Sequence, residues 1–245
     1  MQDPVFQYTL RLGDDALVLG RRLSAWCGHA PSLEVDLGLS NLALDLVGQA
    51  TDFLELAAKI ESRGRDADTL AFRRQPPEFH NCLLVEQDNG DFAQTLARQF
   101  LYSNWQVLFL EALSGSAHKD LATIAGKWVR DVAYHVDFAT GWMIRLGDGN
   151  CLSHPRLVKS LDALWGLTEE LFTMDDLDRR LLQQGIAVDK TALRGEYDNR
   201  VTAVLHDAGL TVPHAPRGPV RRKHDEPPAV EMHFNSREHD VRWGF

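Results

Sequence analysis

The sequence predicts an all-α fold, and three observations support this prediction. Apolar residues recur at three- and four-residue spacing over four long stretches, and no stretch alternates apolar and polar residues for more than a few positions. Glycine, proline or a short polar loop ends each long stretch. The length of 245 residues, with 44% hydrophobic and 25% charged content, suits one large globular domain. We expect a helical domain over residues 1–210 and an irregular tail over residues 211–245.

The first two helices follow from their apolar stripes. The first is expected over Phe6–Ala30, where Pro31 prevents its continuation. The second is expected over Ser32–Ile60, with Ser32 as its N-cap. Its stripe consists of Leu39, Leu42, Leu46, Gln49, Phe53, Ala57 and Ile60. Residues 64–90 then form a long connection with two short helical turns, expected at Thr69–Phe72 and Cys82–Val85.

The third and fourth long helices are expected at Asp91–Leu113 and Lys119–Leu146. Asp91 is the N-cap of the third, and a short loop around Gly115 makes the two antiparallel neighbours. The stripe of the third includes Gln99, and the stripe of the fourth includes His135. Shorter helices are expected at Ser153–Phe172, Asp175–Gln184 and Thr191–Ala208.

The last part of the chain has a different composition. Five of the ten prolines lie between Pro213 and Pro228, beside the basic run Arg221–Lys223. Such a segment does not favour a packed helix, so we expect it to be irregular or ordered by a partner.

Charge and cysteine content limit the function classes. A formal net charge of −9 argues against nucleic acid or an anionic membrane as the main partner. No apolar run is long enough to span a bilayer, and Met1–Pro4 does not resemble a signal peptide. Cys27, Cys82 and Cys151 are odd in number and widely spaced, which indicates reduced thiols in a cytoplasmic protein.

A carboxylate beside the apolar stripe of the second helix raises a specific hypothesis. Asp45 lies between Leu42 and Leu46, where a buried charge needs a metal, a cation or a proton. Four long helices with inward carboxylates are the frame of a ferritin-like di-iron site. That site takes a Glu from each of two helices and Glu-x-x-His from each of the other two, about six ligands in all.

The ligand set of such a site is largely missing. The Glu-x-x-His position of the second helix reads Asp45–Gly48, and that of the fourth reads Asp131–Tyr134, with His135 one place late. The first helix has no acidic residue between Asp15 and Trp26, and the third has none between Asp91 and Glu111. The sequence therefore argues against a di-iron site in this chain.

Two interpretations of the remaining polar residues stay open. In the first, Asp45 and Asp131 form buried ion pairs, with Lys127 or Arg98 as the candidate cation, and His135 is a core histidine. This polar core would fill the place of the two metal ions and bind no metal. In the second, the chain is a stand-alone ferritin-like di-metal oxidase that uses Asp45, Asp131 and His135.

Several ordered segments resemble one known family. Over about Gln7–Pro213 the chain resembles the PaaC subunits of bacterial phenylacetyl-CoA epoxidases (ring 1,2-phenylacetyl-CoA monooxygenases). The tail departs from the family, because only Ala229–Met232 matches the helix with which its members commonly end. The matching segments are Tyr8–Asp15, Arg22–Pro31, Asn41–Ala50, Asp68–Phe72, Leu83–Gln87, Gly90–Ala93, Tyr134–Phe138 and Gly185–Asp189.

The resemblance implies a ferritin-like, non-catalytic structural subunit with no cofactor of its own. Its partner would be a catalytic di-iron A subunit that binds phenylacetyl-CoA and activates O₂. A small B subunit and a reductase with flavin, an iron–sulfur cluster and NADPH would complete the system. The product would be the ring epoxide, formed in aerobic phenylacetate catabolism. A free-standing helical homodimer is the remaining alternative.

Overall fold

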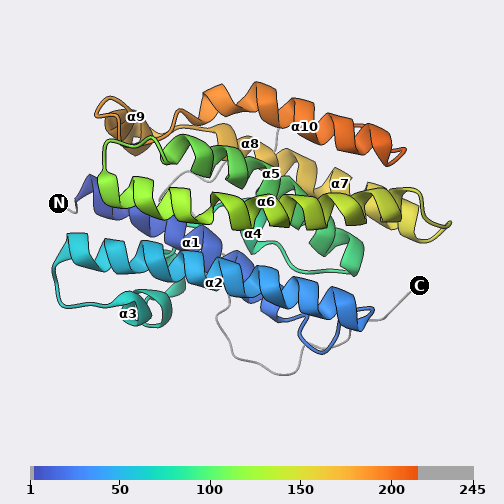
Figure 1. Cartoon of the computed structure of the whole chain (residues 1–245), viewed down its shortest axis with the longest axis horizontal. Coiled ribbons are helices and arrows are strands. Elements are labelled where there is room, and N and C mark those ends of the chain that lie inside the picture. The colour runs from blue at the N-terminus through green and yellow to red at the C-terminus, as the bar shows by residue number, and fades with distance from the viewer. Residues whose placement is uncertain (1–2, 215–245) are drawn as a thin grey trace.

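Four long helices form the body of the molecule and confirm the all-α, ferritin-like prediction. The computed structural model describes residues 3–214, which contain helices and loops only. The four long helices run along a common axis (Figure 1). They are α1 (Pro4–Ser24), α2 (Leu33–Glu61), α5 (Phe92–Leu113) and α6 (Lys119–Gly147).

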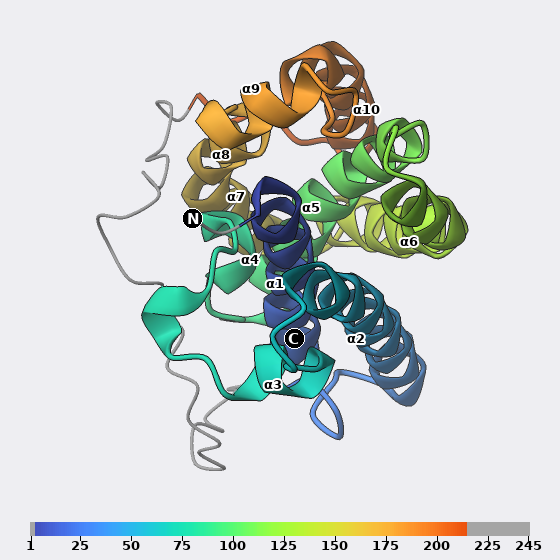
Figure 2. The same cartoon turned by 90° about the vertical axis from the view of Figure 1, so that its left-hand side faces the viewer.

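The long helices are arranged as two antiparallel hairpins. Helix α1 packs along α2, α5 packs along α6, and the hairpins meet where α2 contacts α6 (Figures 1 and 2). Gly13 and Gly20 allow α1 to approach α2 closely. A Cβ atom at Gly13 would lie 2.8 Å from Leu54 Cδ2, and one at Gly20 would lie 3.2 Å from Leu46 Cβ.

Capping side chains explain most helix starts. Ser32 caps α2 by accepting from the Val35 N–H at 3.4 Å, and Asp91 caps α5 by accepting from the Gln94 N–H at 3.0 Å. Both predicted caps are confirmed. Asp3 is a further cap, because its carboxylate accepts from the Val5 N–H at 2.7 Å and starts α1 before the expected Phe6.

The predicted continuation of the first helix to Ala30 is wrong. Helix α1 ends at Ser24, and the N–H groups of Trp26 and Cys27 bond to carbonyl groups three residues earlier. Gly28 then adopts a φ of 77°, a left-handed conformation that ends the helical path.

The connection between α2 and α5 contains the two short helical turns that the sequence predicts. Its elements are α3 (Ala67–Phe72), the 3₁₀ turn η1 (Pro76–Glu78) and α4 (Leu83–Glu86). The buried Asp14 of α1 forms an ion pair with Arg74 of the connection, with 3.0 Å between Oδ2 and Nη1. This contact ties the connection to the outside of the first hairpin.

Shorter helices cover the opposite side of the bundle. Helices α7 and α10 both pack against α5 and α6 (Figure 2). The predicted single helix Ser153–Phe172 is wrong, because a 3₁₀ turn at Gly166 divides it. Residues 215–245, most of the predicted tail, lie outside the described residues, so the domain boundary at 210 stays a prediction. The elements are α7 (Ser153–Trp165), η2 (Gly166–Thr168), α8 (Glu169–Phe172), α9 (Asp176–Leu182), η3 (Lys190–Leu193) and α10 (Arg194–Asp207).

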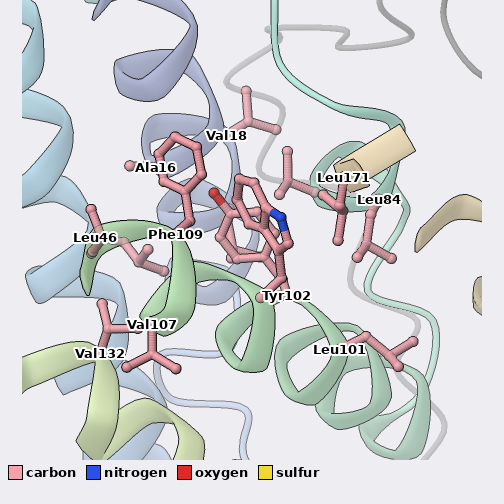
Figure 3. Close-up of a cluster of buried hydrophobic side chains, with 14 of the residues drawn as sticks. Ala16, Val18, Leu46, Leu84, Leu101, Tyr102, Val107, Phe109, Val132 and Leu171 are labelled. Carbon is pink, nitrogen blue, oxygen red and sulfur yellow. The ribbon is translucent and has the colours of Figure 1, made fainter. Parts of the chain in front are cut away.

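The core between the hairpins is mainly apolar. Leu46 of α2, Val107 of α5 and Val132 of α6 lie together at the centre (Figure 3), and all three are buried. Such a core is the main stabilising contribution to a fold of this kind. Within residues 3–214, no helix combines the length and apolar character needed to cross a membrane.

Candidate functional site

Asp45 and His135 meet across the contact between α2 and α6. His135 Nε2 lies 3.1 Å from Asp45 Oδ2. The His135 side chain is 0% exposed, whereas that of Asp45 is 34% exposed. The carboxylate therefore reaches solvent at the edge of the contact between α2 and α6, which we call the α2–α6 seam. The geometry orients the imidazole, as carboxylates commonly orient histidines. His135 Nδ1 is buried and has no hydrogen-bond partner in the described part of the chain.

Asp131 lies one helical turn before His135 and is half-buried. No hydrogen bond or ion pair links its carboxylate to another residue in the range 3–214. The structure therefore places Asp131 on the same seam as Asp45 without giving it a counterion.

The two candidate cations pair elsewhere, which corrects the predicted ion pairs. Lys127 Nζ lies 2.6 Å from Asp52 Oδ2, and Trp128 Nε1 donates to the same oxygen at 2.7 Å. Lys127 precedes Asp131 by four residues, and a cation on the N-terminal side of an acid is the weaker arrangement in a helix. The acid across the seam therefore binds the lysine.

Arg98 is the second corrected assignment. It is 0% exposed, and it donates to the Gln87 carbonyl and, at 2.7 Å, to Asn89 Oδ1. Burial, and then the nearby Arg22, lower the pKa of Arg98 to about 9. Arg98 lies near the start of α5, so its guanidinium bonds to the last residues of the connection between α2 and α5 and not to Asp45 or Asp131.

Two buried glutamines between α2 and α5 form a hydrogen-bonded pair that the sequence analysis did not predict. Gln106 Nε2 of α5 donates to Gln49 Oε1 of α2 at 2.8 Å, and both side chains are buried. Gln99 lies two helical turns before Gln106 on α5. It is also buried, and neither the nitrogen nor the oxygen of its side-chain amide has a hydrogen-bond partner within residues 3–214. The available signal was the presence of Gln49 and Gln99 in otherwise apolar stripes.

These side chains do not supply the donors of a di-iron centre. Such a centre needs about six carboxylate and imidazole ligands because two cations must be neutralised and bridged. One carboxylate–imidazole pair and a layer of neutral amides meet between the helices instead. Within residues 3–214, no group of three or more His, Cys, Asp or Glu side chains could hold a metal ion. The absence of a metal in this chain stays a prediction.

A second polar cluster holds the connection against α1 and α8. Asp15 Oδ1 accepts from the Cys82 N–H at 2.7 Å, and Asp14 Oδ2 accepts from the His80 N–H at 2.9 Å. Glu170 Oε2 accepts from the Leu83 N–H at 2.7 Å. Burial raises the pKa of the Asp15 carboxyl to about 7, and the charges of Glu170 and Asp14 contribute to that rise. We call this cluster the α1 anchor.

Fold and site together define a ferritin-like helical bundle without the acidic ligand set of the di-iron members. The chain belongs to the family of phenylacetic acid catabolic proteins, whose model matches residues 1–243. It is 47% identical, over 206 residues, to the C subunit of 1,2-phenylacetyl-CoA epoxidase from Escherichia coli (strain K12). That match covers 84% of this chain and 83% of the relative.

Proposed function

We propose that this chain is the non-catalytic structural subunit of a multicomponent di-iron monooxygenase. The complex epoxidises phenylacetyl-CoA in aerobic phenylacetate catabolism. The di-iron centre lies in a catalytic A subunit, a small B subunit joins it, and a reductase with flavin, an iron–sulfur cluster and NADPH supplies electrons. The free thiols of Cys27, Cys82 and Cys151 agree with a cytoplasmic location.

The donor chemistry of the bundle core is the observation that supports this proposal best. Where a di-iron protein needs acidic ligands, this chain has the neutral Gln49–Gln106 pair and a single Asp45–His135 contact. A relative that is named as a subunit supports a role within an assembly. Oxygen chemistry is then assigned to a neighbouring chain, and this chain supports that neighbour through helix contacts.

Co-expression with the catalytic A subunit of the same organism tests the proposal. We expect a stable hetero-complex on gel filtration, with a total buried interface above about 2,000 Å². After the subunits are separated, iron should remain with the A subunit. Failure of the two full-length chains to associate would contradict the proposal.

The Asp45–His135 contact favours one alternative, a stand-alone di-metal oxidase that also uses Asp131. Metal analysis of the isolated chain distinguishes the two functions. Near-stoichiometric iron, together with loss of iron and oxidase activity in Asp131→Ala, would support the alternative.

A further inference from the structure

The outer face of α2 carries apolar side chains where a solvent-facing helix normally carries charges. Leu33, Leu37 and Leu44 are 71%, 57% and 68% exposed. At about 100° per residue they lie within roughly 40° of one another around the helix. They point away from the core side of α2, which carries the buried Leu42 and Leu46. An ordered row of this kind marks an association surface.

Helix α6 extends this surface with an aromatic pair. Tyr134 is 48% exposed, and its ring centroid lies 6.5 Å from that of Phe138. The contact between Asp45 and His135 brings Leu44 and Tyr134 to within about one helical turn of each other along the two antiparallel helices. The rows on α2 and α6 therefore form one surface, which we call the α2–α6 face.

Two carboxylates lie in the seam beneath this face. Asp45 is partly exposed, and His135 is the partner that the structure shows for it. Asp131 precedes His135 by one turn and faces the same seam without a cation among residues 3–214, because Lys127 is bound to Asp52. Two half-buried acids, neither with a lysine or arginine partner among residues 3–214, are complementary to a positively charged group.

We propose that the catalytic A subunit docks on the α2–α6 face through a helix with an apolar stripe and a basic side chain near its centre. The apolar stripe packs on Leu33, Leu37, Leu44 and Tyr134, and the basic group lies between Asp45 and Asp131. Arginine suits this position best, because its planar guanidinium can bind two carboxylates at once. This inference rests on the proposed function and specifies its contact surface. Apolar contacts supply most of the affinity, and the buried charge sets the register of the two helices.

The test measures the dissociation constant between the full-length chain and the purified A subunit. Leu44→Asp removes an apolar contact and should weaken binding by at least about 30-fold. Asp131→Asn keeps the shape of the side chain but removes the charge, and it should weaken binding by about tenfold. The affinity of the Asp131→Asn variant should also depend less on salt than that of the wild type.

Two matched controls lie outside the face. Leu152→Asp alters another exposed leucine, which precedes α7, and Asp162→Asn alters an exposed acid on α7 itself. Both should leave the dissociation constant within about twofold of the wild type. Because all four positions are at least partly exposed, circular dichroism should show the same helix content for every variant.

The outcomes separate the inference from the proposed function. Suppose that the wild type binds the A subunit and that Leu44→Asp and Asp131→Asn bind it as tightly as the two controls do. The A subunit then does not dock on the α2–α6 face, and the proposed function stands. If the wild type does not bind, the proposed function itself fails. If Leu44→Asp instead splits a homodimer of this chain, a second copy covers the face and the inference is overturned.

Discussion

The α1 anchor and the α2–α6 seam both contain carboxylates inside the protein, but they satisfy them in different ways. In the anchor, Asp14, Asp15 and Glu170 each accept a backbone N–H from the connection, and Asp14 also binds Arg74. In the seam, Asp45 contacts only an imidazole among the described residues.

The difference follows from the backbone. Residues 80–83 include non-helical backbone at the start of α4, and its N–H groups are free to bind carboxylates. In the middle of α2 and α6 every N–H group is used within its own helix. A carboxylate between two helices therefore needs another side chain, and Asp131 has none within residues 3–214. The hydrogen bonds of the anchor and its Asp14–Arg74 ion pair stabilise this chain, whereas charge in the seam is available to a partner.

Breaking the anchor should have the largest effect. Asp14→Ala leaves the guanidinium of Arg74 buried without its carboxylate, and we expect the free energy of unfolding to fall by about 3–5 kcal/mol. Urea denaturation measures the change. Asp176→Ala breaks the solvent-exposed pair with Arg179 and should leave the midpoint nearly unchanged. Equal midpoints for both variants would show that the anchor does not hold the connection.

The pH dependence of stability tests the anchor more finely. The folded pKa of Asp15, about 7, exceeds the unfolded value of 3.8. The folded state therefore keeps a proton that the unfolded state loses. The contribution of this group is full below about pH 4, decreases as the pH rises and is lost above about pH 7, with a slope of at most about 1.4 kcal/mol per pH unit.

Asp15→Asn removes this titration and keeps an oxygen that can accept from the Cys82 N–H. The free energy of unfolding of the wild type should therefore decrease relative to that of the variant between about pH 4 and 7. Urea unfolding at several pH values measures both curves. Parallel curves would mean that Asp15 is ionised throughout this range.

The smallest expected effect concerns the amide pair at the centre of the bundle. Gln49→Leu or Gln106→Leu alone leaves one buried amide without its partner and should cost about 1–2 kcal/mol. The loss of unfolding free energy in the double variant should be about 1 kcal/mol smaller than the sum of the losses in the two single variants. Combining Gln49→Leu with Gln183→Leu, an exposed position on the far side, should be additive. Additivity in both cases would show that the amide pair is not coupled.

Local chemistry made most of the fold predictable. Periodicity located all four long helices, and the hydroxyl of Ser32 and the carboxylate of Asp91 marked two of their starts. The end of α1 at Ser24 and the 3₁₀ turn at Gly166 were missed because apolar residues continue past both points. Apolar spacing does not distinguish a helix from a tight turn of the same composition.

The candidate site was predictable only in part. Asp45 and His135 stood out because polar side chains interrupt apolar stripes, but their contact depends on the register between α2 and α6. Lys127 was assigned by its distance along the chain, and its true partner, Asp52, lies 75 residues away. The anchor was missed because most of its partners are backbone N–H groups, which every residue except proline carries.

The arrangement of the long helices as two hairpins has a consequence for folding kinetics. Each hairpin joins segments that are near in sequence, and such local contacts form early and fast. Contacts between hairpins, including Gln49 with Gln106, require both to exist first. We expect substitutions at this meeting surface to accelerate unfolding while leaving the folding rate nearly unchanged. A newly made chain would then reach a paired-hairpin intermediate before its central layer closes.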